Sequence, residues 1–269
     1  FGSNSWNAYV YNGNNTNDAL NNYRGFYNHN TLNFNSTSMW AAASNPGTAA
    51  GYSGCTVNND THIVRYKRRG FTCGYYQIDI SGHDDNAQLF INGTQVFVHN
   101  GCCDAHSAAW SGFLGASSTV ELRWTEGVGD SYGALNFTTV AFPTITPPVT
   151  ICAGTSTTLT ASGAANYNWS TNTTHLVAPY INAPVLVSPP GAPPISTQTY
   201  TVQTTDAATS CTVSNSVVVT INPLPATAVT PTTANFCTSG SLDVTASGAN
   251  TYVWSPMTNI AVTSPSGHT

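Results

Sequence analysis

Two stretches of this 269-residue chain repeat each other at a fixed offset. Cys152 and Trp169 are 17 residues apart, as are Cys237 and Trp254, and both stretches carry the string TASGA, which gives an offset of 85. Self-similarity of this kind is typical of tandem modules. Serial modules behind a different N-terminal domain usually hold a binding head away from a surface rather than perform chemistry.

The first copy continues to Tyr200 and Cys211, whereas the second ends at Thr269, before its own counterparts of those residues. We therefore expect this chain to be a fragment of a longer one, or a strand to be donated by another subunit.

Charge divides the chain into two kinds of sequence. Charged residues make up 6% of the chain, against roughly 25% in an average soluble protein. All six basic residues lie between Arg24 and Arg123, so the last 146 residues have no Lys or Arg. A net charge of -5 argues against a nucleic-acid partner, because phosphate binding needs a basic surface. No apolar run reaches the roughly 18 residues of a membrane span.

Proline-rich segments mark the expected domain boundaries. We expect a β-sandwich at 1–142, a linker at 143–150, a module at 151–222, a second linker at 223–232 and an incomplete module at 233–269. The fold class is predicted to be all-β, because no amphipathic helix is evident.

Short alternating segments predict the strands. In the first domain they lie at 6–11, 23–27, 61–71, 74–80, 87–99, 119–125 and 134–142. In the next module they lie at 156–161, 166–170, 199–204 and 217–221. Asn92-Gly93 predicts a tight hairpin, because both residues tolerate positive φ. Trp169 is predicted to lie in a core. Residues 178–195 carry six prolines and are expected to form a surface loop rather than a central strand.

The seven cysteines favour an oxidising, extracellular setting, because the chain has few charges and no C-x-x-C pair. Cys152 and Cys211 are expected to pair and close a loop of about sixty residues, which contributes roughly 4 kcal/mol. Cys237 is then left over, and its partner is expected beyond Thr269.

Four further cysteines lie in the N-terminal domain: Cys55, Cys73, Cys102 and Cys103. Either Cys55 and Cys73 each bond one member of the adjacent pair, or they bond each other and leave a ring at Cys102 and Cys103. We prefer the first arrangement. Zinc at Cys102-Cys103-Asp104, with the help of nearby histidines His99 and His106, is disfavoured because the spacing is not that of a standard zinc site.

The first 142 residues resemble the anthrax-protective-antigen and flocculin-type lectin-like domains. The resemblance rests on four strings: WNAYVY from Trp6, YRGFY from Tyr23, GHDDNAQLFING from Gly82 and VELRW from Val120. It implies a lectin-like β-sandwich. Sugar-binding members hold calcium with two aspartates joined by a cis peptide, and two sugar hydroxyls fill free positions on the ion. Asp84 and Asp85 match that pair.

Elementary electrostatics also favours a cation at Asp84 and Asp85. Adjacent carboxylates repel, so both stay ionised only when a cation or hydrogen-bond donors satisfy them. Calcium takes about 6 to 8 oxygen ligands in irregular geometry. Asp130, in the loop from Glu126 to Tyr132, is a candidate for the further ligand that such lectins take from a later loop. The alternative is a solvated turn, where Asp is common.

The repeated modules are similar to the Ig-like and PKD-like repeats of bacterial surface proteins, especially Bacteroidota-type adhesins exported by the type IX route. They depart from antibody domains, because Cys211 follows Tyr200 by eleven residues. The resemblance implies spacer modules built as small sandwiches. It also implies an extracellular, cell-surface location.

The favoured function is therefore a secreted adhesin fragment: a lectin-like head that binds a glycan or surface polysaccharide, with calcium as its cofactor, on Ig-like spacers. No enzymatic activity is expected. The alternatives are a structural subunit of a filament or stalk, which contacts neighbouring subunits of the same protein and binds no sugar, and a carbohydrate-binding module of a larger secreted enzyme.

Two further patterns have ordinary explanations. Gly129 to Gly133 fits the G-x-S-x-G string of hydrolases, but a β pattern follows where the nucleophile elbow needs a helix. Arg65, Lys67 and Arg69 share one face of a strand, which indicates a solvated face or a protected sheet edge. A binding face for an acidic polysaccharide or an acidic module is the functional alternative.

Overall fold

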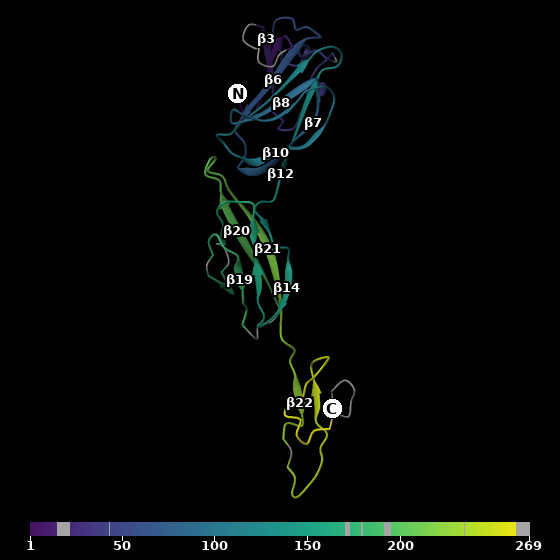
Figure 1. Cartoon of the computed structure of the whole chain (residues 1–269), viewed down its shortest axis with the longest axis vertical. Coiled ribbons are helices and arrows are strands. Elements are labelled where there is room, and N and C mark those ends of the chain that lie inside the picture. The colour runs from purple at the N-terminus through teal and green to yellow at the C-terminus, as the bar shows by residue number, and fades with distance from the viewer. Residues whose placement is uncertain are drawn as a thin grey trace.

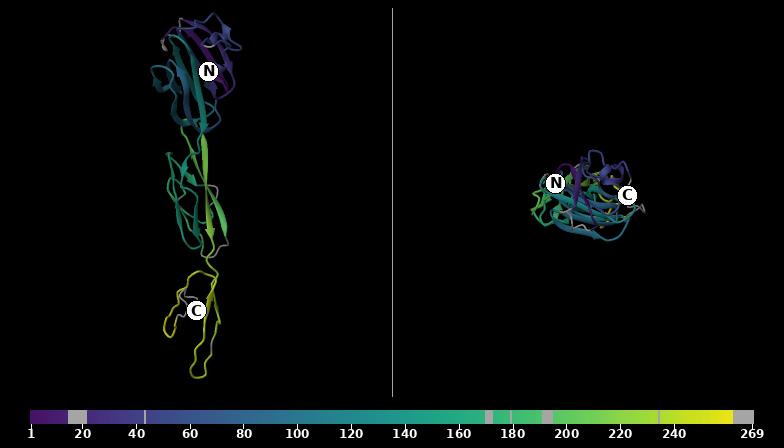
Figure 2. Two further views of the ribbon diagram at one scale, coloured as in Figure 1. Left: turned by 90° about the vertical axis from the view of Figure 1, so that its right-hand side faces the viewer. Right: turned by 90° about the horizontal axis from the view of Figure 1, so that it is seen from above.

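The computed structural model describes residues 1–14, 22–42, 44–169, 173–178, 180–190, 195–233 and 235–261. In these ranges the chain forms strands, two short 3-10 helices and no α-helix, which confirms the predicted all-β class. Three bodies follow one another along the long axis, from the purple and blue head through a green module to a yellow one (Figure 1; Figure 2, left). No helix in the described part of the chain is long and apolar enough to cross a bilayer.

The head is a sandwich of two sheets. The larger sheet has the order β5-β3-β2-β6-β11-β8-β9, with β1 also paired to β6, and the smaller has the order β10-β7-β12-β4. The elements are β1 (Gly2–Ser3), β2 (Trp6–Asn12), β3 (Tyr23–His29), β4 (Phe34–Asn35), η1 (Ser36–Ser38), η2 (Pro46–Thr48), β5 (Ser53–Gly54), β6 (His62–Arg69), β7 (Gly74–Asp84), β8 (Asn86–Ile91), β9 (Thr94–His99), β10 (His106–Leu114), β11 (Thr119–Glu126) and β12 (Tyr132–Thr139).

Aromatic side chains fill the space between the two sheets. Trp6, Tyr66 and Trp124 are fully buried. The ring of Phe34 stacks on Tyr66 at 4.2 Å between centroids, and Trp124 stacks on the same tyrosine at 5.3 Å. Such rings bury large apolar areas and prefer offset or edge contacts, so they supply much of the head's stability.

The hairpin prediction is confirmed. Strands β8 and β9 pair around Asn92 and Gly93, whose φ angles of 50° and 82° are both positive. Strand β10 was missed by the sequence analysis. Its pairing with β7 shifts register between His106 and Trp110, and Ala108 between them has a φ of 50°, so simple alternation is lost there.

The basic row on β6 does not protect a sheet edge, because β6 lies between β2 and β11. Lys67 forms an ion pair with Glu121 on β11, with 3.5 Å between Nζ and Oε2. Arg68 points into the head and lies against the rings of Trp6 and Phe71. Within the row, Lys67 is therefore paired inside the larger sheet, whereas Arg69 is exposed.

The middle module packs a four-stranded sheet, β14-β21-β20-β17, near a three-stranded one, β15-β19-β18. Its strands are β13 (Thr144–Ile145), β14 (Val149–Cys152), β15 (Thr157–Leu159), β16 (Ala161–Ser162), β17 (Asn168–Trp169), β18 (Leu176–Val177), β19 (Val185–Val187), β20 (Ser196–Thr205) and β21 (Thr212–Asn222). Trp169 is buried in the core between them, as predicted.

The proline-rich stretch at 178–195 was wrongly expected to hold no central strand. Within it, β19 is the middle strand of the three-stranded sheet, and Val185 and Val187 are fully buried. The reason is local: the three residues of β19 contain no proline, while Pro184 and Pro189 stand outside the paired positions.

The third body repeats the start of the second. Strands β22 (Ala228–Thr230) and β23 (Thr245–Ser247) pair as β13 and β16 do. One hydrogen bond recurs at the sequence offset of 85: the backbone N–H of Ala164 donates to the Tyr167 hydroxyl at 2.8 Å, and that of Ala249 donates to the Tyr252 hydroxyl at 2.6 Å. The same sequence string therefore builds the same turn twice.

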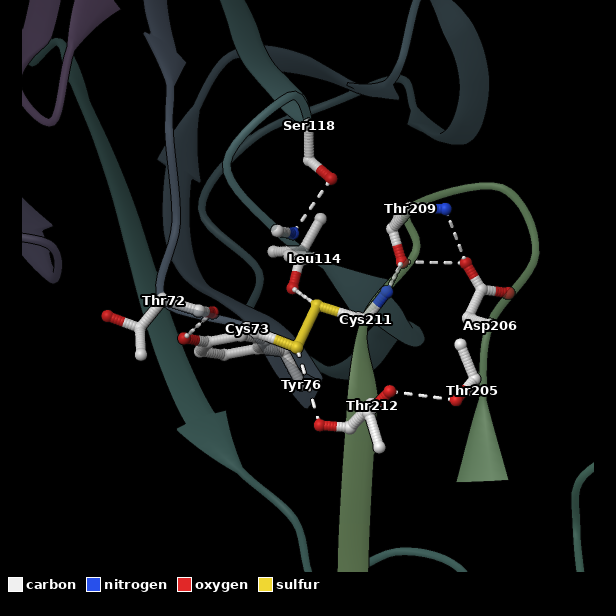
Figure 3. Close-up of a disulfide and its surroundings, with 11 residues drawn as sticks. Thr72, Cys73, Tyr76, Leu114, Ser118, Thr205, Asp206, Thr209, Cys211 and Thr212 are labelled. Carbon is white, nitrogen blue, oxygen red and sulfur yellow. Dashed lines mark hydrogen bonds between the residues drawn. A yellow bond between two sulfur atoms is a disulfide. The ribbon is translucent and has the colours of Figure 1, made fainter. Parts of the chain in front are cut away.

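A disulfide joins the head to the middle module. It links Cys73, just before β7, to Cys211, just before β21, with 5.4 Å between the Cα atoms (Figure 3). The sulfur of Cys211 lies 3.2 Å from the Leu114 carbonyl oxygen of the head. The Asn215 side chain also donates to the Pro143 carbonyl oxygen at 2.9 Å. The junction is therefore held by covalent and polar contacts.

The predicted pairing of Cys152 with Cys211 is wrong. Cys152 lies opposite Asn222 at one end of β21, whereas Cys211 precedes the other end. At about 3.3 Å per residue the two are about 35 Å apart, far more than the roughly 7 Å limit for Cα atoms in a disulfide. Cys152 and Cys237 are free and exposed in the structure.

Candidate functional site

The two aspartates lie at the end of the head that faces away from the middle module. Strand β7 begins just after Cys73 at the junction and ends at Asp84. Its eleven residues span about 33 Å at the usual rise. The peptide bond between Asp84 and Asp85 is cis, as the resemblance implied. Asp84 is almost completely buried.

Backbone hydrogen bonds fix the position of Asp85. Its N–H donates to the carbonyl oxygen of Thr125 on β11 at 2.5 Å. Its Oδ2 accepts from the N–H of Gly127, just after β11, at 2.8 Å. The end of β7 is thereby held against the end of β11, so residues far apart in the sequence meet here.

A third carboxylate completes the group. Asp84, Asp85 and Glu126 each offer a carboxylate oxygen, and the three oxygens lie within 4.8 Å of one another. Glu126 is fully buried, and both of its carboxylate oxygens lack a hydrogen-bond partner among the described residues. A buried carboxylate without donors is unfavourable unless a cation or a proton compensates it.

Asp84, Asp85 and Glu126 form a carboxylate triad, and the charges that act on Asp84 and Glu126 are all negative. Burial, and then the charge of Asp85, raises the pKa of Asp84 to about 6. Burial, and then the charges of Asp85 and Asp84, raises the pKa of Glu126 to about 7; Asp60 and Asp130 add smaller effects in the same direction. The charges acting on Glu126 are all negative, so the triad is a favourable place for a cation.

The signal for Glu126 was present in the sequence. Val120, Leu122 and Trp124 alternate along β11 and face the core, and Glu126 continues the same face two residues later. An acidic residue in an inward register needs a partner. Without that register, Glu126 is identified from the sequence only as the start of a loop.

Asp130 lies near the carboxylate triad but is not one of its members. Its Oδ1 accepts a hydrogen bond from the Ser44 hydroxyl at 3.1 Å. It lines a cavity of about 450 Å³ together with Thr37, Trp40, Ser44, Ser131 and Tyr132. Asp130 is therefore placed at the wall of a polar and aromatic hollow beside the site.

The loop at 127–131 is anchored by Ser131 and its neighbours. His62 Nδ1 donates to the Asn58 carbonyl oxygen at 3.0 Å, so its Nε2 accepts from the Ser131 hydroxyl at 2.8 Å. The indole N–H of Trp124 also donates to that hydroxyl at 3.2 Å. Ser131 is buried and followed directly by strand β12, so the nucleophile elbow of a hydrolase is not formed.

Gly133, the last glycine of the G-x-S-x-G string, has a packing role. A Cβ on Gly133 would lie 2.5 Å from the indole of Trp124. The backbone N–H of Gly133 also donates to the buried Ser36 hydroxyl at 2.9 Å. The G-x-S-x-G match is thus explained by core packing and loop anchoring.

Cys102 and Cys103 form a disulfide with each other beside Asp84. The preferred prediction, in which Cys55 and Cys73 each bond one member of this pair, is wrong. The N–H of Cys103 donates to the His83 carbonyl oxygen near the outer end of β7, whereas Cys73 lies at the opposite end of that strand. Cys55 is free and exposed. Disulfide sulfurs are not thiolates, so Asp84, Cys102 and Cys103 do not make a zinc site.

No protein-family model and no curated protein matches the sequence. Among solved structures, the PA14 sugar-binding domain from an RTX adhesin is similar at 15% identity, with a TM-score of 0.39, over 50% of this chain and 89% of that one. The PA14 domain of the MpAFP antifreeze protein is similar at 13% identity, with a TM-score of 0.40, over 52% and 85%. A GH31 alpha-xylosidase from Xanthomonas citri matches at 13% identity, with a TM-score of 0.32, over 50% of this chain and 13% of the enzyme.

Proposed function

We propose that the head is a calcium-dependent glycan-binding domain of an extracellular, cell-surface adhesin, and that the following modules are its spacers. The observation that carries the proposal is Glu126, whose buried carboxylate has no hydrogen-bond partner among the described residues and lies beside Asp84 and Asp85. A bound cation would supply Glu126 with a partner and offset the negative charge of all three carboxylates.

The donor set suits calcium. The ligands are three carboxylates, which hard cations prefer, and the irregular arrangement at a strand end is one that calcium accepts. With one oxygen each, Asp84, Asp85 and Glu126 supply three of the about 6 to 8 oxygens that calcium takes. Water or neighbouring hydroxyls of a sugar would fill the remaining positions.

The position of the carboxylate triad suits recognition of a surface glycan. It lies about 33 Å from the junction with the middle module, at the outer end of β7. The cavity beside it is lined by Trp40, Tyr132 and Asp130, which combine aromatic faces with a polar group. Such a combination is suited to a sugar ring and its hydroxyls.

Calorimetry on chelator-treated protein tests the metal. We expect one calcium ion per chain, with binding abolished in the double variant Asp84→Asn with Asp85→Asn and weakened in Glu126→Gln. Asp243→Asn, which changes an exposed carboxylate in the third body, serves as the matched control and should bind as the parent does. Unchanged calcium binding in the double variant would defeat the metal site.

A glycan array tests the ligand separately. The parent protein should bind a subset of glycans in calcium and lose that binding in EDTA, and Asp243→Asn should behave in the same way. Calcium binding without any glycan signal would leave the metal site standing and remove the lectin function.

The second candidate function is a stalk subunit that binds no sugar. The disulfide between Cys73 and Cys211 favours it, because a covalent junction stiffens a rod whether or not the head has a ligand. The two candidates differ on the array: a stalk subunit gives no glycan signal in calcium or in EDTA.

A further inference from the structure

Three histidines from three strands meet behind the carboxylate triad. His83 lies near the end of β7, His99 ends β9 and His106 begins β10. Each offers a ring nitrogen, and these nitrogens lie within 4.8 Å of one another. The ring centroids are 5.1 Å apart for His83 and His99, 5.2 Å for His83 and His106, and 4.6 Å for His99 and His106. The sequence had placed His99 and His106 near each other but not His83, which reaches the cluster from β7.

The hydrogen bonds define which nitrogen of His83 carries the lone pair that could bind a metal ion. Its Nδ1–H donates to the carbonyl oxygen of Asp85 at 2.6 Å, so the lone pair lies on Nε2. That Nε2 accepts a hydrogen bond from the Nε2–H of His106 at 3.0 Å, a proton that a bound metal would displace. Two nitrogens bound to one tetrahedral zinc at about 2.1 Å lie about 3.4 Å apart, so only a small adjustment separates this pair from a ligating pair.

His99 supplies the third nitrogen. Its Nδ1 is buried and lacks a hydrogen-bond partner in the described part of the chain, while its Nε2 lies 3.6 Å from the exposed Asp104 carboxylate. Metal-binding histidines commonly have such outer partners: a carbonyl oxygen for His83 and a carboxylate for His99. His99 and His106 are only half-buried, which leaves a route for an ion.

We propose that His83, His99 and His106 bind one divalent transition metal ion, with Zn²⁺ as the reference ion, at a site separate from the carboxylate triad. Imidazole nitrogen is the ligand that zinc, copper and nickel prefer, whereas calcium prefers oxygen, so each neighbouring site selects its own class of ion. Three histidines leave one tetrahedral position for water or an external ligand.

The metal would also fix the loop that borders the glycan site. Residues 100–105 connect β9 to β10, so an ion between His99 and His106 closes this loop at both ends. The loop carries the Cys102–Cys103 disulfide, which lies beside Asp84. The histidine site would therefore hold one wall of the carboxylate site in place.

Zinc titration of tag-free, chelator-treated protein tests the proposal. Calcium is kept in excess throughout, so that the carboxylate triad does not compete with the histidines for zinc. We expect one equivalent of zinc to bind. His99→Ala and His106→Ala should each weaken binding by at least about tenfold, and the double variant should show no saturable binding. His175→Asn is the matched control, since it removes a histidine from the middle module at a position whose φ of 63° suits Asn.

The outcomes separate this site from the proposed calcium site. The double variant Asp84→Asn with Asp85→Asn should lose calcium but keep zinc affinity within about threefold, since the His83 ring is held by a backbone carbonyl. Circular dichroism and thermal melts establish that each variant is folded. Failure of the parent to bind zinc, or equal binding by the parent and folded His99→Ala and His106→Ala variants, overturns the proposal and makes the cluster a packing contact of three rings.

Discussion

Cys73 and Cys211 are 138 residues apart in the sequence and bond the base of the head to the top of the middle module. Their sulfurs are surrounded by groups from both bodies: the Leu114 carbonyl oxygen of the head and the Thr212 carbonyl oxygen of the module (Figure 3). The bond replaces the cross-link within the module that the cysteine spacing had suggested.

Removing this bond should loosen the junction without unfolding the head. In Cys73→Ser with Cys211→Ser we expect a broader distribution of intramolecular distances in small-angle X-ray scattering, because the linker and a few polar contacts remain. The middle module should also lose stability, up to about 5 kcal/mol on the chain-entropy model for a loop of 138 residues. Cys152→Ser, which removes a free exposed thiol, is the control and should match the parent. Identical scattering from the double variant and the parent would show that the bond does not restrain the junction.

Glu126→Gln should have opposite effects on stability and on metal binding. Without calcium, the variant should be more stable than the parent at neutral pH, by on the order of 1 kcal/mol, because it removes a buried carboxylate that has no donor in the described part of the chain. With calcium, the parent should gain more stability than the variant, because the ion binds the carboxylate more strongly than the amide. Thermal melts in EDTA and in calcium measure both effects. A variant that is less stable than the parent in EDTA would contradict this account.

Acid should destabilise the head through His62. Burial lowers the pKa of His62 to about 4 in the folded chain, against about 6.5 when it is unfolded. The folded state therefore keeps His62 neutral, and stability is lost as pH falls from about 6.5 to about 4, by up to roughly 3 kcal/mol. Burial also lowers the pKa of His29 to about 4, in the same direction.

Over the same pH range, protonation of Asp84 and Glu126, whose pKa values are raised, stabilises the folded head. The His62 contribution is therefore measured as the difference between the parent and His62→Gln in urea unfolding from pH 7.5 to pH 4. His62→Gln should lower stability at pH 7.5 and reduce the slope with pH, while His175→Asn should keep the parent's slope. A His62→Gln slope equal to that of the parent would assign the acid sensitivity to other groups.

Gly133→Ala should destabilise the head by about 1–3 kcal/mol, because the new methyl group would press against the Trp124 indole. Gly93→Ala is a useful comparison. No atom lies within 4 Å of a Cβ there, so its cost comes from the positive φ of 82° alone. Urea midpoints of the two variants measure the difference. If Gly133→Ala were as stable as the parent, close packing on Trp124 would not explain why a glycine occupies position 133.

The sequence predicted features that depend on neighbouring residues better than features that depend on residues far apart in the chain. The Asn92-Gly93 turn depends on two adjacent residues, and the structure places it as predicted. The inward row of Val120, Leu122 and Trp124 depends only on strand alternation. The cysteine pairs depend on where whole strands end, and the spacing of Cys152 and Cys211 held no information about the roughly 35 Å between them.

The candidate site shows the same division. Asp84 and Asp85 are neighbours in the sequence and could be named from their motif. Glu126 and the three histidines reach the site from β11, β7, β9 and β10, and only the pairing of those strands brings them together. Strand β10 also has an irregular register, so His106 could not be given a face from alternation.

The position of the Cys73–Cys211 bond would have a mechanical consequence if the proposed ligand pulled on the head. Tension applied at Asp84 would run down β7 to Cys73, cross the disulfide to Cys211 and continue along β21 toward the linker that follows Asn222. This route is covalent throughout, and it leaves the segment between Asp85 and Cys211 off the loaded path. A pull on the tip would therefore stretch two long strands end to end, while the rest of the head and module carried little of the force.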